Sequence, residues 1–168
     1  MLKEKFTPTV VLLSICLAVA LLLAAVNLVT LPIIQKAQEQ KLQNSLRKVM
    51  PLGEDFEEIS TDKLDAAVTK AFTEKNGGFV FQVEVTGYKP GLIIVCGIDA
   101  DGKITGADYI SSSETLSAEV GLGEKFVGHT SSTITPEIIA GPTAKLTTNA
   151  DYKAIQIALE SYAALQNK

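Results

Sequence analysis

The sequence has few of the residues from which catalytic and metal sites are commonly built. Its 168 residues include no tryptophan, two cysteines and one histidine. Structural zinc sites need four Cys or His ligands at close spacing, so a zinc site of that kind is excluded. Neither a Gly-rich phosphate loop nor a G-x-S-x-G nucleophile motif occurs, which makes a Ser/His/Asp hydrolase a poor fit.

Positive charge is also scarce. Fifteen Lys and Arg residues stand against 19 Asp and Glu residues, which gives a formal net charge of −4. Proteins that bind nucleic acid usually carry a basic face. The composition therefore predicts no nucleic-acid partner.

One long stretch has no charge at all. Residues 10–31 contain only uncharged, mostly apolar side chains, and as a helix they would extend about 33 Å, enough for a hydrocarbon core of about 30 Å. We predict a transmembrane helix over residues 10–31, after a short cytoplasmic N-terminus of residues 1–9. Lys3 and Lys5 in that N-terminus favour the cytoplasmic side. The prediction is thus a single-pass protein of the cell (inner) membrane whose C-terminal domain is extracytoplasmic.

Two other interpretations of the N-terminus fit less well. A cleaved secretory signal has an apolar core of about 7–15 residues, shorter than this run, although Ala18-Val19-Ala20 offers a nominal cleavage site. A pilin-like start would place Glu at the fifth position from Phe6, where Val10 stands. An uncleaved anchor is favoured, and both the anchor and the signal imply an exported domain.

The remaining chain predicts one α+β domain over residues 51–168, entered through a juxtamembrane helix over residues 35–50. Apolar residues at helical spacing predict a further helix over residues 61–74. Alternating apolar residues then predict a twisted antiparallel meander of three strands. Flanking helices complete the fold, the last of them starting after Thr148 or Asn149. The ranges of the three strands are 79–86, 92–98 and 103–111.

Residues 112–149 are rich in serine, threonine and glycine and show little periodicity. Irregular segments of this length in a compact domain are generally functional or disordered. Hydroxyl groups, backbone amides and a helix N-terminus together suit the binding of a phosphate group. The segment is therefore the candidate binding region of the domain.

Several motifs resemble those of a known family. The span exit, Asn27-Leu-Val-Thr-Leu-Pro-Ile33, and the segment Leu46-Arg-Lys-Val-Met-Pro51 are similar to segments of small flavin-binding subunits of membrane electron-transport complexes. The resemblance is to the FMN-binding subunit of the Rnf ion-translocating complex and, more distantly, to its counterpart in the sodium-translocating NADH:quinone reductase. Leu92-Ile-Ile-Val95 and Gly102-Lys-Ile-Thr-Gly106 are similar to the family's central strands.

The first loop motif of that family is Glu-Thr-Pro-Gly-Leu-Gly. Here Glu114-Thr115 and Gly121-Leu122-Gly123 match it, with residues 116–120 in place of the single proline. The resemblance implies that these residues line the flavin ring.

The second motif is Ser-Gly-Ala-Thr, whose threonine is esterified to the phosphate of FMN in the family. Gly141 and Thr143 match it in this chain. A second register follows from the similarity of residues 146–150 to the stretch after the family's threonine, and it places Lys145 at the attachment position. Lysine has no hydroxyl group for a phosphoester, so the first register, with Thr143, is favoured.

The resemblance implies a membrane-anchored flavoprotein that relays electrons through one FMN within an ion-translocating oxidoreductase complex. Such a chain is an electron-carrier subunit rather than a stand-alone enzyme. Implied partners are the other membrane subunits and a flavin transferase, which attaches the FMN to Thr143, while Thr147 and Thr148 hydrogen-bond near the phosphate. The departures at residues 116–120 and at Lys145 leave an alternative open: a structural or interaction paralogue that lacks the cofactor or binds FMN non-covalently.

Overall fold

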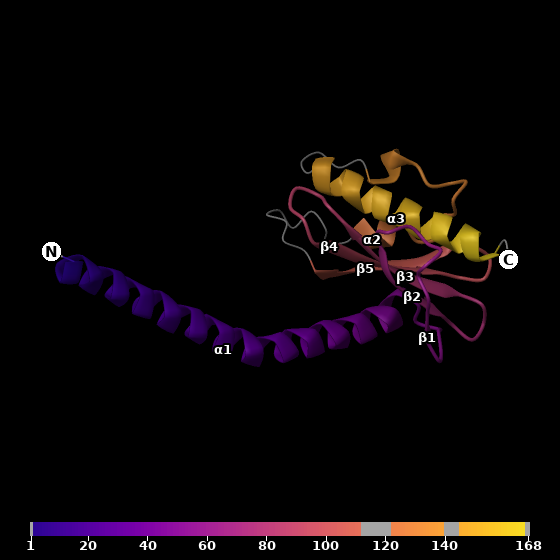
Figure 1. Cartoon of the computed structure of the whole chain (residues 1–168). Coiled ribbons are helices and arrows are strands. Elements are labelled where there is room, and N and C mark those ends of the chain that lie inside the picture. The colour runs from indigo at the N-terminus through magenta and orange to yellow at the C-terminus, as the bar shows by residue number, and fades with distance from the viewer. Residues whose placement is uncertain (1, 112–121, 140–144, 167–168) are drawn as a thin grey trace. The chain divides into compact units, whose positions relative to one another are not determined.

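The structure is a computed structural model that describes residues 2–111, 122–139 and 145–166. The chain divides into two compact units, Met1–Gln40 and Lys41–Lys168. Figure 1 shows the elements, which follow one another along the chain in this order: α1 (Leu2–Val49), β1 (Glu57–Ile59), β2 (Val68–Thr73), β3 (Phe79–Val85), β4 (Leu92–Ile98), β5 (Ile104–Ser111), α2 (Leu122–Lys125), the 3₁₀ helix η1 (Pro136–Ile139) and α3 (Lys145–Gln166).

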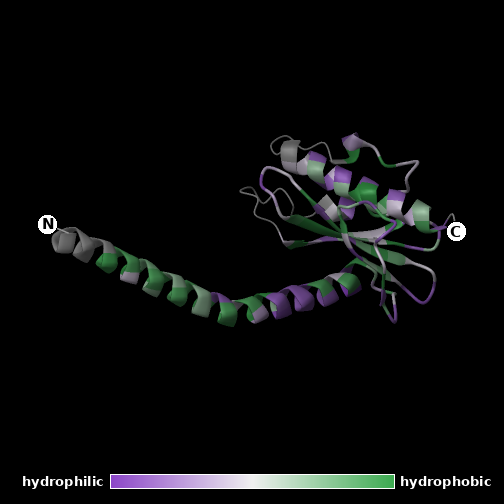
Figure 2. Ribbon diagram, in the orientation of Figure 1, coloured by the Kyte–Doolittle hydropathy of each residue, from purple (hydrophilic) through white to green (hydrophobic). Residues whose placement is uncertain are grey.

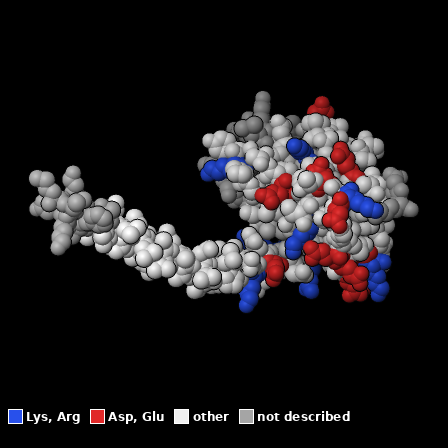
Figure 3. All heavy atoms as spheres, in the orientation of Figure 1, with Lys and Arg blue, Asp and Glu red and all other residues white. Residues whose placement is uncertain are grey.

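The first unit consists of helix α1 up to Gln40. By length and composition α1 can cross a membrane, and its side chains from residue 10 to residue 29 are all exposed. Figure 2 shows this apolar part and the more polar part that follows it, and Figure 3 shows that the apolar part carries no charged side chains. This confirms an N-terminal helix long and apolar enough to span a bilayer.

Helix α1 continues past the predicted end of the membrane span near Pro32. The helix predicted over residues 35–50 is present to Val49, but it is the direct continuation of the predicted span, because α1 runs through Pro32 without interruption. A proline inside a helix removes one backbone hydrogen bond, and long helices tolerate this loss when the neighbouring bonds persist. The predicted stop before Pro51 is correct within one residue.

The second unit is built on a five-stranded sheet with the order β1-β2-β3-β4-β5, in which every neighbouring pair is antiparallel. The predicted strand over residues 92–98 is confirmed, the strand predicted over residues 79–86 ends one residue earlier, and the third begins one residue later than expected. A turn at Asp99–Gly102 joins β4 to β5, with a hydrogen bond from the Asp99 amide to the Lys103 carbonyl of 2.9 Å. The α+β class and the antiparallel meander are therefore confirmed.

The predicted helix over residues 61–74 is wrong. Residues 68–73 form strand β2, which pairs with β3 along its length and with β1 at its C-terminal end. Val68 and Phe72 favour strands, and ladder bonds to β3 outweigh the helical spacing of a short apolar run. Asn76 and Gly77 consequently form the β2–β3 turn, where Gly77 has a φ of 90°.

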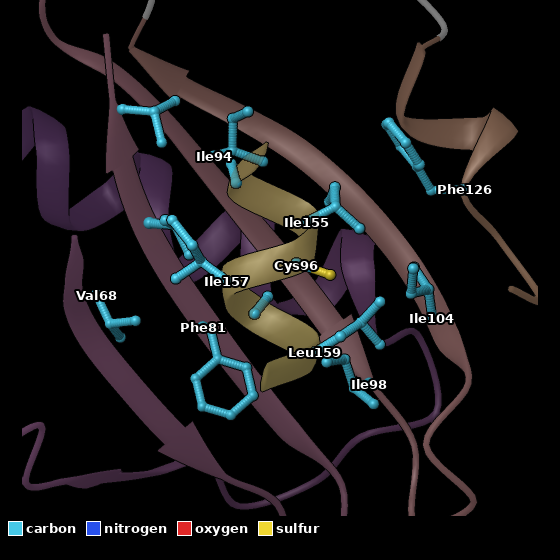
Figure 4. Close-up of a cluster of buried hydrophobic side chains, with 14 of the residues drawn as sticks. Val68, Phe81, Ile94, Cys96, Ile98, Ile104, Phe126, Ile155, Ile157 and Leu159 are labelled. Carbon is cyan, nitrogen blue, oxygen red and sulfur yellow. The ribbon is translucent and has the colours of Figure 1, made fainter. Parts of the chain in front are cut away.

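Helices cover both faces of the sheet. On one face, α3 packs on β3 and β4 in the core cluster of Figure 4, which includes Phe81, Ile94, Cys96, Ile98, Ile155, Ile157 and Leu159. On the other face, the last residues of α1 pack on β2 to β5 through Leu42, Leu46, Val49, Met50, Phe72, Val80, Val95 and Ile110. Leu42, Leu46, Val49 and Met50 thus belong to the core of the domain.

Helix α3 starts earlier than expected. It begins at Lys145 rather than after Thr148 or Asn149. Thr147, expected to lie ahead of the helix, is buried inside its first turn. Packing of this turn within the second unit overrides the preference of threonine and asparagine for cap positions.

Candidate functional site

The residues singled out by the two loop motifs divide into two groups. Glu114, Thr115, Gly121, Gly141 and Thr143 lie outside the described residues. Leu122, Gly123, Thr147 and Thr148 lie within elements α2 and α3. The geometry of the candidate site is therefore given by these four residues and by the elements that flank the two motifs.

The elements that flank the two motif segments are in contact with one another. Helix α2 directly follows residues 112–121, while η1 directly precedes residues 140–144 and α3 directly follows them. Helix α2 contacts both β5 and η1, and η1 contacts α3. The chain therefore enters and leaves both motif segments within one connected group of elements.

Position 123 must be glycine because α2 packs closely on β5, not because a cofactor approaches it. A Cβ atom at this position would lie 2.1 Å from the backbone oxygen of Ala107 on β5. Real Cβ atoms do not approach a carbonyl oxygen so closely, so α2 can lie on β5 only because residue 123 has no side chain. The glycine expected to admit a flavin ring thus faces the backbone of β5.

The segment after α2 also covers the outer side of β5. The Gly128 amide donates to the Ile104 carbonyl at 2.8 Å, and the Ile104 amide donates to the His129 carbonyl at 2.9 Å. Phe126, the residue that follows α2, is buried in the core. These contacts hold α2 in place at the end of the first motif.

The first turn of α3 carries the described hydroxyl groups. Thr147 is buried and Thr148 is half-buried. The first four backbone amides of a helix have no intrahelical acceptor, and the helix dipole makes this end positive. A helix N-terminus of this kind is the chemistry that binds a phosphate group, and of the two hydroxyl groups only that of the half-buried Thr148 is partly exposed.

Asp151 is a buried polar residue that the motifs do not indicate. It lies on α3 four residues after Thr147, and its side chain is fully buried. A carboxylate is seldom completely buried, because transfer of its charge from water is costly. In the sequence, Asp151 is recognisable only as an acidic residue next to Ala150, in a helix whose core-facing residues are otherwise apolar. Asp151 therefore belongs with Thr147 in the polar part of the α3 packing surface.

Two glycines, one on β4 and one on β5, support the end of α1. Gly97 and Gly106 are paired across β4 and β5, and a Cβ atom on either would lie 2.8 Å from backbone atoms of Val49. The Thr105 hydroxyl donates to the Val49 carbonyl at 2.6 Å, which satisfies one of the free carbonyls at the helix end. We call Gly97, Thr105 and Gly106 the helix seat.

Asp108 strengthens the same contact. It accepts hydrogen bonds from Ser45 at 2.7 Å and from Lys48, both on α1. Although burial opposes ionisation, the hydrogen bonds from Lys48 and Ser45 and the positive charge of Lys48 keep the pKa of Asp108 below its usual value. The α1 end and β5 are thus joined by an ion pair in addition to apolar packing.

Neither a reactive thiol nor a metal-binding cluster is found among the described residues of the domain core. Cys96 is completely buried, which raises the pKa of its thiol to about 12, so it is an inert core residue. Within the described ranges, no group of three or more His, Cys, Asp or Glu side chains could hold a metal ion.

No protein-family model matches the chain, and no curated protein matches it significantly.

Proposed function

We propose that this chain is a membrane-anchored flavoprotein subunit that relays electrons through one FMN, linked by its phosphate to Thr143, within an ion-translocating oxidoreductase complex. The proposal rests on the motif resemblance. The structural observation that carries it is the contact of α2 with η1 and of η1 with α3. A single flavin site requires that the ring-lining motif and the attachment motif lie near each other. The contacts between the elements that flank the two motifs support this arrangement.

The start of α3 adds chemical support. Thr143 lies two residues before Lys145, the first residue of the helix. A phosphoester on Thr143 would therefore be close in the chain to the positive end of α3, whose first turn includes Thr147 and Thr148. Glu114, Thr115, Gly121 and Leu122 would contact the ring, Gly123 would hold α2 against β5, and Gly141 would lie beside the attachment site.

A role in which FMN supplies the redox chemistry and the protein only holds the cofactor is consistent with the small number of acid–base residues in the chain. FMN supplies exchange of electrons singly or in pairs, so the protein needs only to hold and tune it. The chain's own groups would fix the phosphate at the α3 end and exclude water through the packing of α2 on β5. The helix α1 would anchor the domain to the other membrane subunits on the extracytoplasmic side.

The test is the intact mass of the full chain after coexpression with a flavin transferase. The wild type should gain the mass of one FMN minus water, and Thr143→Ala should lose this gain. Thr135→Ala is the matched control, because Thr135 is an exposed threonine just before η1 and its loss should leave the modification intact. Failure of the wild type to gain mass would overturn the covalent proposal.

One further variant distinguishes attachment at Thr143 from the alternative alignment, which places Lys145 at the attachment position. If Lys145 stands at the attachment position, the wild type should carry no covalent FMN, and Lys145→Thr should gain it even when Thr143 is replaced by alanine. That result would support the alternative of a paralogue that has lost its covalent cofactor. Modification lost on Thr143→Ala alone would exclude it.

A further inference from the structure

The turn between β3 and β4 carries an exposed aromatic side chain. Tyr88 is 65% exposed, whereas the other aromatic residues in the described part of the second unit are buried or half-buried. The Gly87 amide donates to the Lys89 carbonyl at 3.2 Å, and Gly91 has a φ of 88°, so the chain reverses tightly here. We call residues 86–91 the Tyr88 turn. Its ring is left uncovered by its own domain and is available to an outside surface.

The Tyr88 turn lies at the end of the sheet where the chain enters the second unit. Ile93, two residues after the turn, pairs with Ser111 at the end of β5. The ammonium group of Lys41 donates to the carbonyl of Ile110, also at the end of β5, at 3.5 Å. Since Lys41 is the first residue of the second unit, the chain arrives at the same end of the sheet that carries the turn.

The uncharged stretch of α1 ends close to this point in the chain. No charged residue occurs from residue 10 to residue 35, and Gln35 comes six residues before Lys41. Six residues extend about 9 Å in a helix and at most about 22 Å in any conformation. The headgroup region adds about 5–8 Å on each side of the hydrocarbon core, and a turn that continues three residues beyond its strands extends about 10 Å. If α1 crosses the bilayer, the Tyr88 turn is therefore within reach of the headgroups.

We propose that the Tyr88 turn rests among the lipid headgroups of the bilayer that α1 crosses, with the Tyr88 ring as an interfacial anchor. Tyrosine favours this region because its ring is apolar while its hydroxyl group stays hydrated. The inference rests on the proposed membrane anchoring of the chain, and it is independent of FMN.

A lipid surface suits this turn better than a protein partner does. A stable protein interface buries about 800 Å² on each partner, whereas Tyr88 is a single exposed ring. The other exposed large hydrophobic residues in the described part of the second unit are Leu52 and Val127. Val127 adjoins Gly128, which is bonded to Ile104 at the opposite end of the sheet, so it adds nothing to the surface around the turn. A tether to the bilayer keeps the local concentration of lipid high, so one ring is sufficient for the contact.

The experiment makes use of the absence of tryptophan from the sequence. Full-chain Tyr88→Trp is reconstituted into phosphatidylcholine vesicles in which a fraction of the headgroups carry a nitroxide, and the quenching of its fluorescence is measured. Aqueous iodide serves as a second quencher in vesicles without nitroxide. Because Tyr88 is exposed, a tryptophan at this position is compatible with the fold. The nitroxide lipid should quench Tyr88→Trp strongly, and iodide should quench it weakly.

Leu52→Trp is the matched control. Leu52 is 91% exposed and comes two residues after Met50, whose side chain lies beside Gly78, just before the start of β3. This is the opposite end of β3 from the Tyr88 turn. Because about 20 Å of sheet separates the two ends, the nitroxide lipid should quench Tyr88→Trp at least about threefold more than Leu52→Trp, and iodide should show the reverse order.

Leu21→Trp tests the membrane anchoring on which the inference rests. Leu21 lies within the uncharged stretch of α1, so lipids with brominated acyl chains should quench a tryptophan there, and the absence of that quenching would refute the anchoring and this inference with it. Quenching of Leu21→Trp, together with equal quenching of Tyr88→Trp and Leu52→Trp by the nitroxide lipid, would overturn the inference about the turn alone. Shielding of Tyr88→Trp from iodide without quenching by the lipid would show that a protein surface covers the ring, and would also overturn it.

Discussion

The helix seat makes a direct prediction about stability. In Gly106→Ala, the new Cβ would lie 2.8 Å from the Cα of Val49 and 2.9 Å from its carbonyl oxygen. Both are backbone atoms, so a rotamer change cannot relieve the contact, and the end of α1 must move away from β5. Overpacking of this kind costs about 1–3 kcal/mol, which corresponds to a fall in melting temperature of about 4–10 °C for a domain of this size.

The assay is thermal unfolding of the full chain in detergent, followed by circular dichroism. Gly106→Val should be worse than Gly106→Ala, because it adds more volume at the same place. Glu84→Ala changes an exposed strand residue and should alter stability by no more than about 0.5 kcal/mol. If Gly106→Ala melts within about 1 °C of the wild type, the close approach of Val49 to the seat is refuted.

Three further predictions follow from the same contacts. Thr105→Val keeps the shape but removes the 2.6 Å bond to the Val49 carbonyl, so urea unfolding should show a loss of about 1 kcal/mol, and no loss would contradict the bond. The lowered pKa of Asp108 stabilises the fold above the unfolded value of about 3.9, and this contribution disappears as pH falls through the folded pKa. Melting temperatures of Asp108→Asn and wild type should therefore differ at pH 7 and converge at low pH, whereas a constant difference would disprove the linkage to this carboxyl group. Gly123→Ala should cost at least about 2 kcal/mol, because its Cβ meets the Ala107 oxygen at 2.1 Å, and an unaltered melting curve would show that α2 does not lie on β5.

The strands could be predicted from the sequence because their signal is local. In β3, side chains alternate between two environments, and β4 is an apolar run bounded by turns, so both follow from period and composition. Strand β2 could not be distinguished from a helix, because its apolar residues satisfy both spacings over so short a run. Its assignment depends on pairing with β3, a contact that a single sequence does not display.

The site was predictable only in part. Hydroxyl and glycine content indicates residues 112–149 as a binding region, but the packing role of Gly123 depends on β5, a separate element of the sheet. The buried position of Asp151 likewise depends on how α3 packs in the second unit. Of the glycines of the helix seat, Gly106 lies in a strand motif that the sequence analysis singled out, whereas the role of both Gly97 and Gly106 follows only from the position of Val49 against them.

The central claim is that Thr143 carries FMN, and intact mass spectrometry tests it most directly. The full chain is coexpressed with a flavin transferase beside the Thr143→Ala and Thr135→Ala variants. The account predicts a mass gain of one FMN minus water in the wild type and in Thr135→Ala, and none in Thr143→Ala. An unmodified wild type, or a gain that survives Thr143→Ala, would contradict it.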